Sequence, residues 1–403
     1  MNEVINKNIG YKKLFYFIVL TLSISLAFAQ GDDDRDYILI ISMAFGPIIY
    51  LSSLSKLIKV DKIFIVFSTL YLIIPLIFRY HYIRWSSLFF SYMYIFYFLA
   101  GVHCAIRGNI SIKNISWITK NIIYAYAIVL LLQQFCVLTG LPVINSSAYL
   151  LNEPWKLNSL SAEPSHSSRL VGILMYGFIY CQSILTGKKL SLSQSFKIDS
   201  KVWIAFLWLE LTTVSGTGML VLLVILTMFI RKKSLPIFGI ILFLFLSYGV
   251  MSDITALKRS STFIGAVLTG DTSQMLGADH SASIRIVPWI LCIQHINIFS
   301  FSSWVGEGMG SVARWMSALI PGVPNDFTGG GVANLIVERG LIIGVFYLII
   351  TFRLCYSKRY RFTSIGLWVL CIALDSINMQ KVWLCMLILF LVKYVNVHND
   401  EYL

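Results

Sequence analysis

Three side chains that can move a proton or hold an anion fall within seven positions of the sequence. Glu163, His166 and Arg169 lie in residues 161–169, next to Pro164 and several serines. A carboxylate or an imidazole can accept a proton from a sugar hydroxyl, and a guanidinium can hold an anionic leaving group. The proline and the serines also suit a turn and a helix cap, so the run fits a structural role as well.

Two further charged residues, Glu338 and Arg339, interrupt an apolar run that ends at Arg353. One continuous helix would place Glu338 about 22 Å from the end marked by Arg353, inside a bilayer about 30 Å thick. Ionisable groups at that depth are costly and are usually functional or paired. The two residues therefore belong either to a site or to a local ion pair.

Arginine and tryptophan residues later in the chain are candidate ligands for phosphate and sugar. Arg285 and Arg314, like Arg169, carry a planar fork that matches phosphate oxygens, although each could equally anchor a helix at the membrane interface. Trp289 could stack on a sugar ring or belong to an interfacial aromatic belt.

The sequence predicts neither a metal nor a cofactor. Asp32 and Asp34 form an Asp-x-Asp pattern that could bind a metal, but the short loop around them favours a solvated run of charge. The seven cysteines have no Cys-x-x-Cys or Cys/His spacing, and nucleotide-binding and zinc-protease motifs are missing from the sequence.

The composition shows what must position these groups. Of the 403 residues, 57% are hydrophobic and 13% charged, against roughly 25% charged in soluble domains. This excludes a soluble globular protein. The net charge of +13 could suggest a nucleic-acid partner, but the apolar runs between the charges are long enough to span a bilayer. The basic residues are therefore counted separately for the two sides of a membrane.

We predict an all-α polytopic membrane protein of about twelve transmembrane helices forming a single domain over residues 1–403. The predicted segments are Leu14–Gln30, Tyr37–Leu54, Ile63–Phe78, Ser86–Ile106, Asn121–Thr139, Arg169–Thr186, Val202–Thr213, Gly218–Ile230, Leu235–Met251, Val332–Phe352, Phe362–Asp375 and Val382–Tyr394.

The charges between these segments predict the orientation. With the N-terminus inside, the inner connections hold about two thirds of the basic residues, which places both termini in the cytoplasm. Two large loops, about 140–168 and 252–331, then face outward. The first segment imitates a cleavable signal peptide, but its length and the even segment count favour a retained helix.

Two predicted hairpins are too short to cross a bilayer, and the second is the final pair of segments, which meets at Ser376–Lys381. Val202–Thr213 and Gly218–Ile230 reach only about 20 Å, which would leave the turn that contains Ser215 below the outer surface. Irregular backbone at that depth is tolerated where it is buried in protein or lines a wet cavity. The alternative is a pair of helices stretched by snorkelling Lys and Arg.

The order of several short motifs around the late outer loop resembles the O-antigen polymerase and O-antigen ligase superfamily. The motifs are Glu163-Pro164, Ser215-Gly216-Thr217-Gly218, Arg285 with Trp289, Gly306-Glu307-Gly308-Met309-Gly310 and Glu338-Arg339-Gly340-Leu341-Ile342-Ile343-Gly344. They cover about residues 160–344, and the first five segments match in number and hydropathy only.

The resemblance implies a metal-independent GT-C-type glycosyltransferase at the periplasmic face of a bacterial inner membrane. Its substrates would be oligosaccharide repeats linked to undecaprenyl pyrophosphate, and its partners a growing glycan, a chain-length regulator and a flippase. The ligase branch commonly has a His ahead of the helix with the Glu-x-Gly motif. No His occurs from Ile296 to Val397, which favours the polymerase of lipopolysaccharide biosynthesis over the ligase.

The resemblance and the residue types together predict the site. Its catalytic residues would be Glu163, Arg169, Arg285 and Glu338, and its substrate-binding residues His166, Ser215, Trp289, Arg314 and Arg339. Glu163 is the first choice for general base, with His166 or Glu338 in reserve, and Arg169 and Arg285 would hold the pyrophosphate. A lipid-linked oligosaccharide flippase is the alternative of another class, although its alternating access favours short loops and repeated halves.

Overall fold

The computed structural model describes residues 12–22, 37–54, 56–108, 110–145, 154–213, 215–230, 262, 265–267, 269–278, 280–324, 327 and 329–396. Helices connected by turns make up this part of the chain, and no strand occurs in it. The all-α class is therefore confirmed. The predicted segment Leu235–Met251 and the Asp32–Asp34 run lie outside the described residues.

In the described part of the chain, four helices are long and apolar enough to cross a membrane: α3 (Lys59–Phe78), α4 (Trp85–Arg107), α5 (Ile112–Thr139) and α6 (Pro164–Leu185). The other helices are α2 (Tyr37–Ser53), α7 (Leu192–Ile198), α8 (Ser200–Thr212), α9 (Gly216–Leu226), α12 (Thr272–Ala278), α13 (His280–His295), α14 (Phe301–Val305), α15 (Ala313–Leu319), α16 (Gly331–Arg339), α17 (Leu341–Cys355), α18 (Arg361–Trp368) and α19 (Gln380–Asn396).

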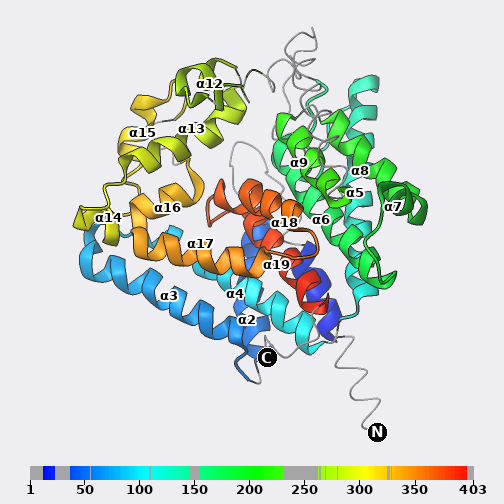
Figure 1. Ribbon diagram of the computed structural model, residues 1–403, viewed down its shortest axis with the longest axis horizontal. Helices are drawn as coiled ribbons and strands as arrows, with labels where there is room; N and C mark the ends of the chain where they lie inside the picture. Colours follow the sequence, from blue (N-terminus) through cyan, green and yellow to red (C-terminus); the bar gives the residue numbers. More distant parts are fainter. Residues whose placement is uncertain are drawn as a thin grey trace.

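The centre of the molecule is α19, which packs on α4, α6 and α17. Every side chain from Val382 to Val392 is at most 1% exposed. Figure 1 shows α19 and α18 in the middle, with α5 to α9 on one side and α3, α16 and α17 on the other. Because α19 is enclosed, its two ends hold Lys381 and Lys393 at fixed places in the fold.

The described part of the predicted loop 252–331, the late helical unit, has a small core of its own. Met275, Val287, Cys292 and Met316, which come from α12, α13 and α15, pack with Val337 of α16. Figure 1 shows α12, α13 and α15 together at one corner. This unit contacts the rest of the molecule through α16 and through α14, which contacts α3 and α17.

The segment predicted as one helix, Val332–Phe352, is two helices that meet at Gly340. Gly340 has φ 95°, and a Cβ there would lie 2.2 Å from the carbonyl oxygen of Trp304. Only glycine fits such a conformation and such a close approach. The prediction of a continuous helix is wrong here, so counting residues from Arg353 does not give the depth of Glu338.

Candidate functional site

A small polar pocket of about 100 Å³ lies where five parts of the chain meet. Its walls come from α3, the first turn of α4, residues 309–310, α16 and the connection between the π-helical turn 369–373 and α19. The charged side chains in its lining are Arg84, Glu338 and Arg339. Two predicted site residues, Glu338 and Arg339, thus belong to one pocket, and Arg84 joins them from another helix.

Glu338 joins α16 to the glycine-rich turn 306–310. Its Oε1 accepts a hydrogen bond from the backbone N–H of Gly310 at 2.8 Å, and its own carbonyl accepts one from Gly308 at 3.1 Å. Gly306, at φ 88°, lies so close that a Cβ would be 2.4 Å from that carbonyl oxygen. Two motifs about thirty residues apart in the sequence therefore form one structural unit.

Arg339 is 3% exposed and stacks on Tyr71 of α3. Its guanidinium carbon lies 4.3 Å from the ring centroid, and its Nη2 donates to the Tyr71 hydroxyl at 3.2 Å. Its Nη1 is buried and has no acceptor among the described residues. The hydroxyl of Ser91, 3.0 Å from that of Tyr71, donates to Oδ1 of Asn378 at 2.7 Å. These bonds tie Arg339 to the connection that leads into α19.

Arg169 takes part in a buried charge cluster at the same connection. Its Nη1 lies 2.6 Å from Oδ2 of Asp375, whose Oδ1 lies 2.9 Å from Nζ of Lys381. All three side chains are at most 7% exposed. One carboxylate faces two cations, so the cluster keeps a net positive charge. Nη2 of Arg169 is buried without an acceptor among the described residues.

The polar pocket and this charge cluster adjoin each other. Asp375 lies in the cluster, and the next three residues, 376–378, line the pocket. Sequence reasoning missed Asp375 and Lys381, because they close one apolar segment and precede the next. Their signal was two ionisable residues of opposite charge on the two sides of a short turn between apolar runs.

Glu163 and His166 lie at the start of α6. Glu163 is the N-cap residue, Pro164 takes the first helical position, and the Glu163 side chain is 51% exposed. Its Oε2 lies 3.8 Å from Nε2 of His166 and accepts a hydrogen bond from the Ser165 hydroxyl. The Glu163 side chain is therefore about half exposed at the start of α6, and it does not line the polar pocket. The ion pair that the structure gives Arg169 is with Asp375 rather than with Glu163.

A second residue that sequence reasoning missed is Glu210 of α8. It is completely buried, and neither carboxylate oxygen has a hydrogen-bond donor in bonding geometry among the described residues. A Cβ on Gly218 would lie 2.9 Å from Oε2 of Glu210 and 2.9 Å from the Ser168 hydroxyl oxygen, so glycine is needed there. Ser215 caps α9 nearby, with its hydroxyl 2.7 Å from that of Thr217. The sequence feature that could have identified Glu210 is the presence of a glutamate inside an apolar run.

The remaining predicted residues lie in the late helical unit. Trp289 of α13 is half-buried against the core of that unit. Arg314 is exposed, with its guanidinium 5.3 Å from the ring centroid of Tyr82. The backbone of Arg285 lies in α13, but its side chain is outside the described part. Neither Trp289 nor Arg314 lines the polar pocket.

This unit also holds a pair that the sequence did not reveal. Nε2 of His295 lies 2.9 Å from Oε1 of Glu307, and the imidazole stacks on Trp315 with centroids 4.8 Å apart. Both charged side chains are about one third or more exposed. Within the described ranges, no three His, Cys, Asp or Glu side chains gather as a metal site would require.

Comparison of the chain with family models, with curated proteins and with solved structures found no match.

Proposed function

We propose that this protein is a polysaccharide polymerase of the O-antigen polymerase type, a glycosyltransferase that acts on undecaprenyl-pyrophosphate-linked repeats. The observation that carries the proposal is a pair of buried guanidinium groups, Arg169 and Arg339, on the two sides of the connection 375–378. Each has a buried N–H without an acceptor among the described residues. Leaving such a group unsatisfied costs free energy that a bound anion would recover, and a pyrophosphate supplies the required oxygens.

The proposed architecture is about twelve transmembrane helices of the GT-C type, with both termini in the cytoplasm. Support comes from where basic side chains gather. Lys13 donates to the carbonyl of Arg107 at 3.1 Å, and Lys393 donates to that of Arg353 at 2.7 Å. Each bond joins the ends of two predicted segments. Lys381 and Lys393 are twelve residues apart on α19, hence about 18 Å, which separates the polar pocket from this basic end.

In the proposed reaction, a hydroxyl oxygen of the acceptor sugar bonds to C1 of the donor sugar while the bond from C1 to the pyrophosphate oxygen breaks. Glu163, at the start of α6, takes the hydroxyl proton. The bonding electrons leave with the pyrophosphate, whose charge Arg169 and Arg339 hold. Donors fixed in place before the reaction stabilise such developing charge without reorganisation.

The other residues have supporting roles in this proposal. Glu338 is a positioning residue, because its Oε1 is bound to the Gly310 N–H and its backbone fixes the turn 306–310 beside Arg339. His166 orients Glu163. Ser215, Trp289 and Arg314 contact the glycan, and Arg285 is a further ligand of the pyrophosphate.

A gel of surface glycan from a strain that lacks the gene tests the proposal. A polymerase defect leaves a single repeat on the lipid core, whereas loss of a ligase or a flippase leaves none. Complementation with Arg339→Lys and Arg285→Lys should each fail to restore polymer, because lysine keeps the charge but loses the planar fork. Glu307→Gln is the matched control, since glutamine retains a hydrogen bond with His295, and it should restore polymer.

A further inference from the structure

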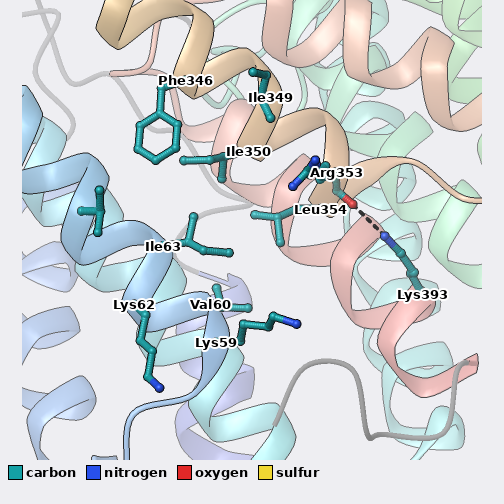
Figure 2. A pocket seen from close by; sticks show the side chains of 11 residues that line it. Lys59, Val60, Lys62, Ile63, Phe346, Ile349, Ile350, Arg353, Leu354 and Lys393 are labelled. Atoms are coloured by element: carbon teal, nitrogen blue, oxygen red, sulfur yellow. Dashed lines mark hydrogen bonds between the residues drawn. The ribbon is translucent and has the colours of Figure 1, made fainter.

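A groove lies at the basic end of the molecule, away from the polar pocket. It has a volume of about 710 Å³, which is in the range of small-molecule sites, and α3, α17 and α19 form its walls. Figure 2 shows Lys59, Lys62, Arg353 and Lys393 on one side of it and apolar side chains on the other. The groove is therefore divided into a cationic part and an apolar part.

The two long walls repeat the same pattern. On α3, Lys59, Lys62, Ile63 and Val66 line the groove, at helical positions i, i+3, i+4 and i+7. Residues with this spacing share one face of a helix. In each wall the cations lie near the helix end, beside Val60 on α3 and Leu354 on α17. The lining residues of α3, from Lys59 to Val66, extend over about 10 Å.

The α17 wall runs in the opposite direction. Phe346, Ile349, Ile350 and Arg353 have the same spacing, but here the cation comes last. Lys59 at the start of α3 and Arg353 near the end of α17 consequently lie at the same end of the groove, with Lys393 of α19 bonded to the Arg353 carbonyl beside them.

The charges of this groove are all of one sign. None of the described residues that line it is acidic. The nearest carboxylate in sequence, Asp61, is completely buried and turned toward α4, where it lies 2.8 Å from Nε2 of His103 and accepts the N–H of Ile58. Lys62 and Arg353, with no acidic residue among the described residues of the lining, attract an anion.

We propose that this groove binds an anionic glycerophospholipid of the cytoplasmic leaflet. The phosphate lies at the cationic end of the groove, and an acyl chain lies along Ile63, Val66 and Ile349. Basic pockets between transmembrane helices on the cytoplasmic side suit such headgroups. The choice of leaflet rests on the proposed orientation, whereas the binding itself does not depend on the proposed activity.

Thermal unfolding of the purified, delipidated full chain in detergent tests this proposal. Dioleoyl phosphatidylglycerol should raise the unfolding temperature in a saturable manner. Dioleoyl phosphatidylcholine, which has the same chains, and inorganic phosphate, which has the anion alone, should not. An equal rise with phosphatidylcholine would mean that only apolar surface is covered, and an equal rise with phosphate would mean a simple anion site; either result would overturn the proposal.

Two kinds of variant localise the effect. The double variant Lys62→Gln, Arg353→Gln should weaken the apparent affinity for phosphatidylglycerol by about tenfold or more. Lys188→Gln with Lys201→Gln removes two charges from exposed positions outside the groove and should leave the affinity unchanged. Val66, 51% exposed, accepts a larger side chain, so Val66→Trp should block the acyl chain and lower the affinity without unfolding the protein. Equal affinity for all four proteins would place the lipid elsewhere.

Discussion

The two pockets at opposite ends of α3 and α19 differ in the signs of the charged side chains that surround them. The polar pocket is small, and the charges in and beside it are of both signs: Glu338 lies among Arg84 and Arg339, and Asp375 lies between Arg169 and Lys381. The groove at the basic end is about seven times larger, and its charged residues are all cations. Buried charge needs compensation within the protein, whereas exposed charge can be compensated by solvent or by a ligand.

This difference determines whether a substitution in each pocket changes stability and function together or separately. At the polar pocket, the ion pair of Arg169 with Asp375 and the contact of Arg339 with Tyr71 join helices, and we propose that the same two guanidinium groups bind substrate. Substitutions there should therefore affect both stability and activity. At the groove, exposed cations contribute little to stability. Each prediction below tests one side of this comparison.

The largest expected effect is on activity, at Glu163. Glu163→Gln keeps the size of the side chain but cannot accept a proton, so the yield of polymer should fall by at least about 100-fold. Binding of the lipid-linked repeat should be retained, which a filter-binding assay with labelled repeat would check. Substantial polymer from this variant would remove Glu163 from the reaction and leave His166 and Glu338 as candidates for the base.

Asp375→Asn should give the largest loss of stability. It leaves Arg169 and Lys381 without a buried counter-charge, so the free energy of unfolding should fall by about 3–5 kcal/mol. Denaturant unfolding in detergent measures this loss.

The matched control for this variant is Asp271→Asn. Asp271 is exposed at the start of α12, where hydrogen bonds from Ser273 and Gln274 lower the pKa of its carboxyl. Its replacement should lower the free energy of unfolding far less than that of Asp375 does. Equal losses for Asp375→Asn and Asp271→Asn would contradict the view that the polar end depends on buried charge pairs.

Gly340→Ala should have an intermediate effect. The added Cβ meets the Trp304 carbonyl, and φ is positive, so unfolding should become easier by about 1–3 kcal/mol and the turn beside Arg339 should shift. Gly140 also has a positive φ, of 71°, but nothing lies within 4 Å of its Cβ position. Gly140→Ala therefore isolates the cost of φ, and it should leave polymer formation intact.

The smallest effect is expected at the groove. In the absence of phosphatidylglycerol, the double variant Lys62→Gln, Arg353→Gln should change the free energy of unfolding by no more than about 0.5 kcal/mol, as at other surface sites. The same denaturant experiment measures this change. A loss comparable with that of Asp375→Asn would show that both pockets depend on charge for folding, and that they do not differ in this respect.

Hydropathy was sufficient for most helix positions. The predicted Ile63–Phe78 and Ser86–Ile106 lie within α3 and α4, with ends that differ by at most four residues. A long apolar run needs its backbone hydrogen bonds satisfied internally, and a helix does this locally. The break at Gly340 was harder to predict because it depends on the approach of Trp304 from another part of the chain.

The candidate site was predictable only in part, for a similar reason. Glu338 and Arg339 stood out as charges in an apolar run, and the structure places both in the polar pocket. The partner of Arg169 could not be predicted, because Asp375 is 206 residues away in the sequence. Side-chain pairing at that distance is set by tertiary packing, which no local pattern encodes.

The most direct test of the account is polymerisation by the purified protein. The full chain in detergent is incubated with undecaprenyl-pyrophosphate-linked repeats in excess EDTA, and the products are separated by length. The account predicts a ladder of two or more joined repeats from the unaltered protein and from Glu307→Gln, and single repeats alone from Arg339→Lys. Failure of the unaltered protein to join repeats, with or without added Mg²⁺ or Mn²⁺, would contradict the proposed glycosyl transfer, and a ladder that needs either ion would contradict a metal-independent reaction.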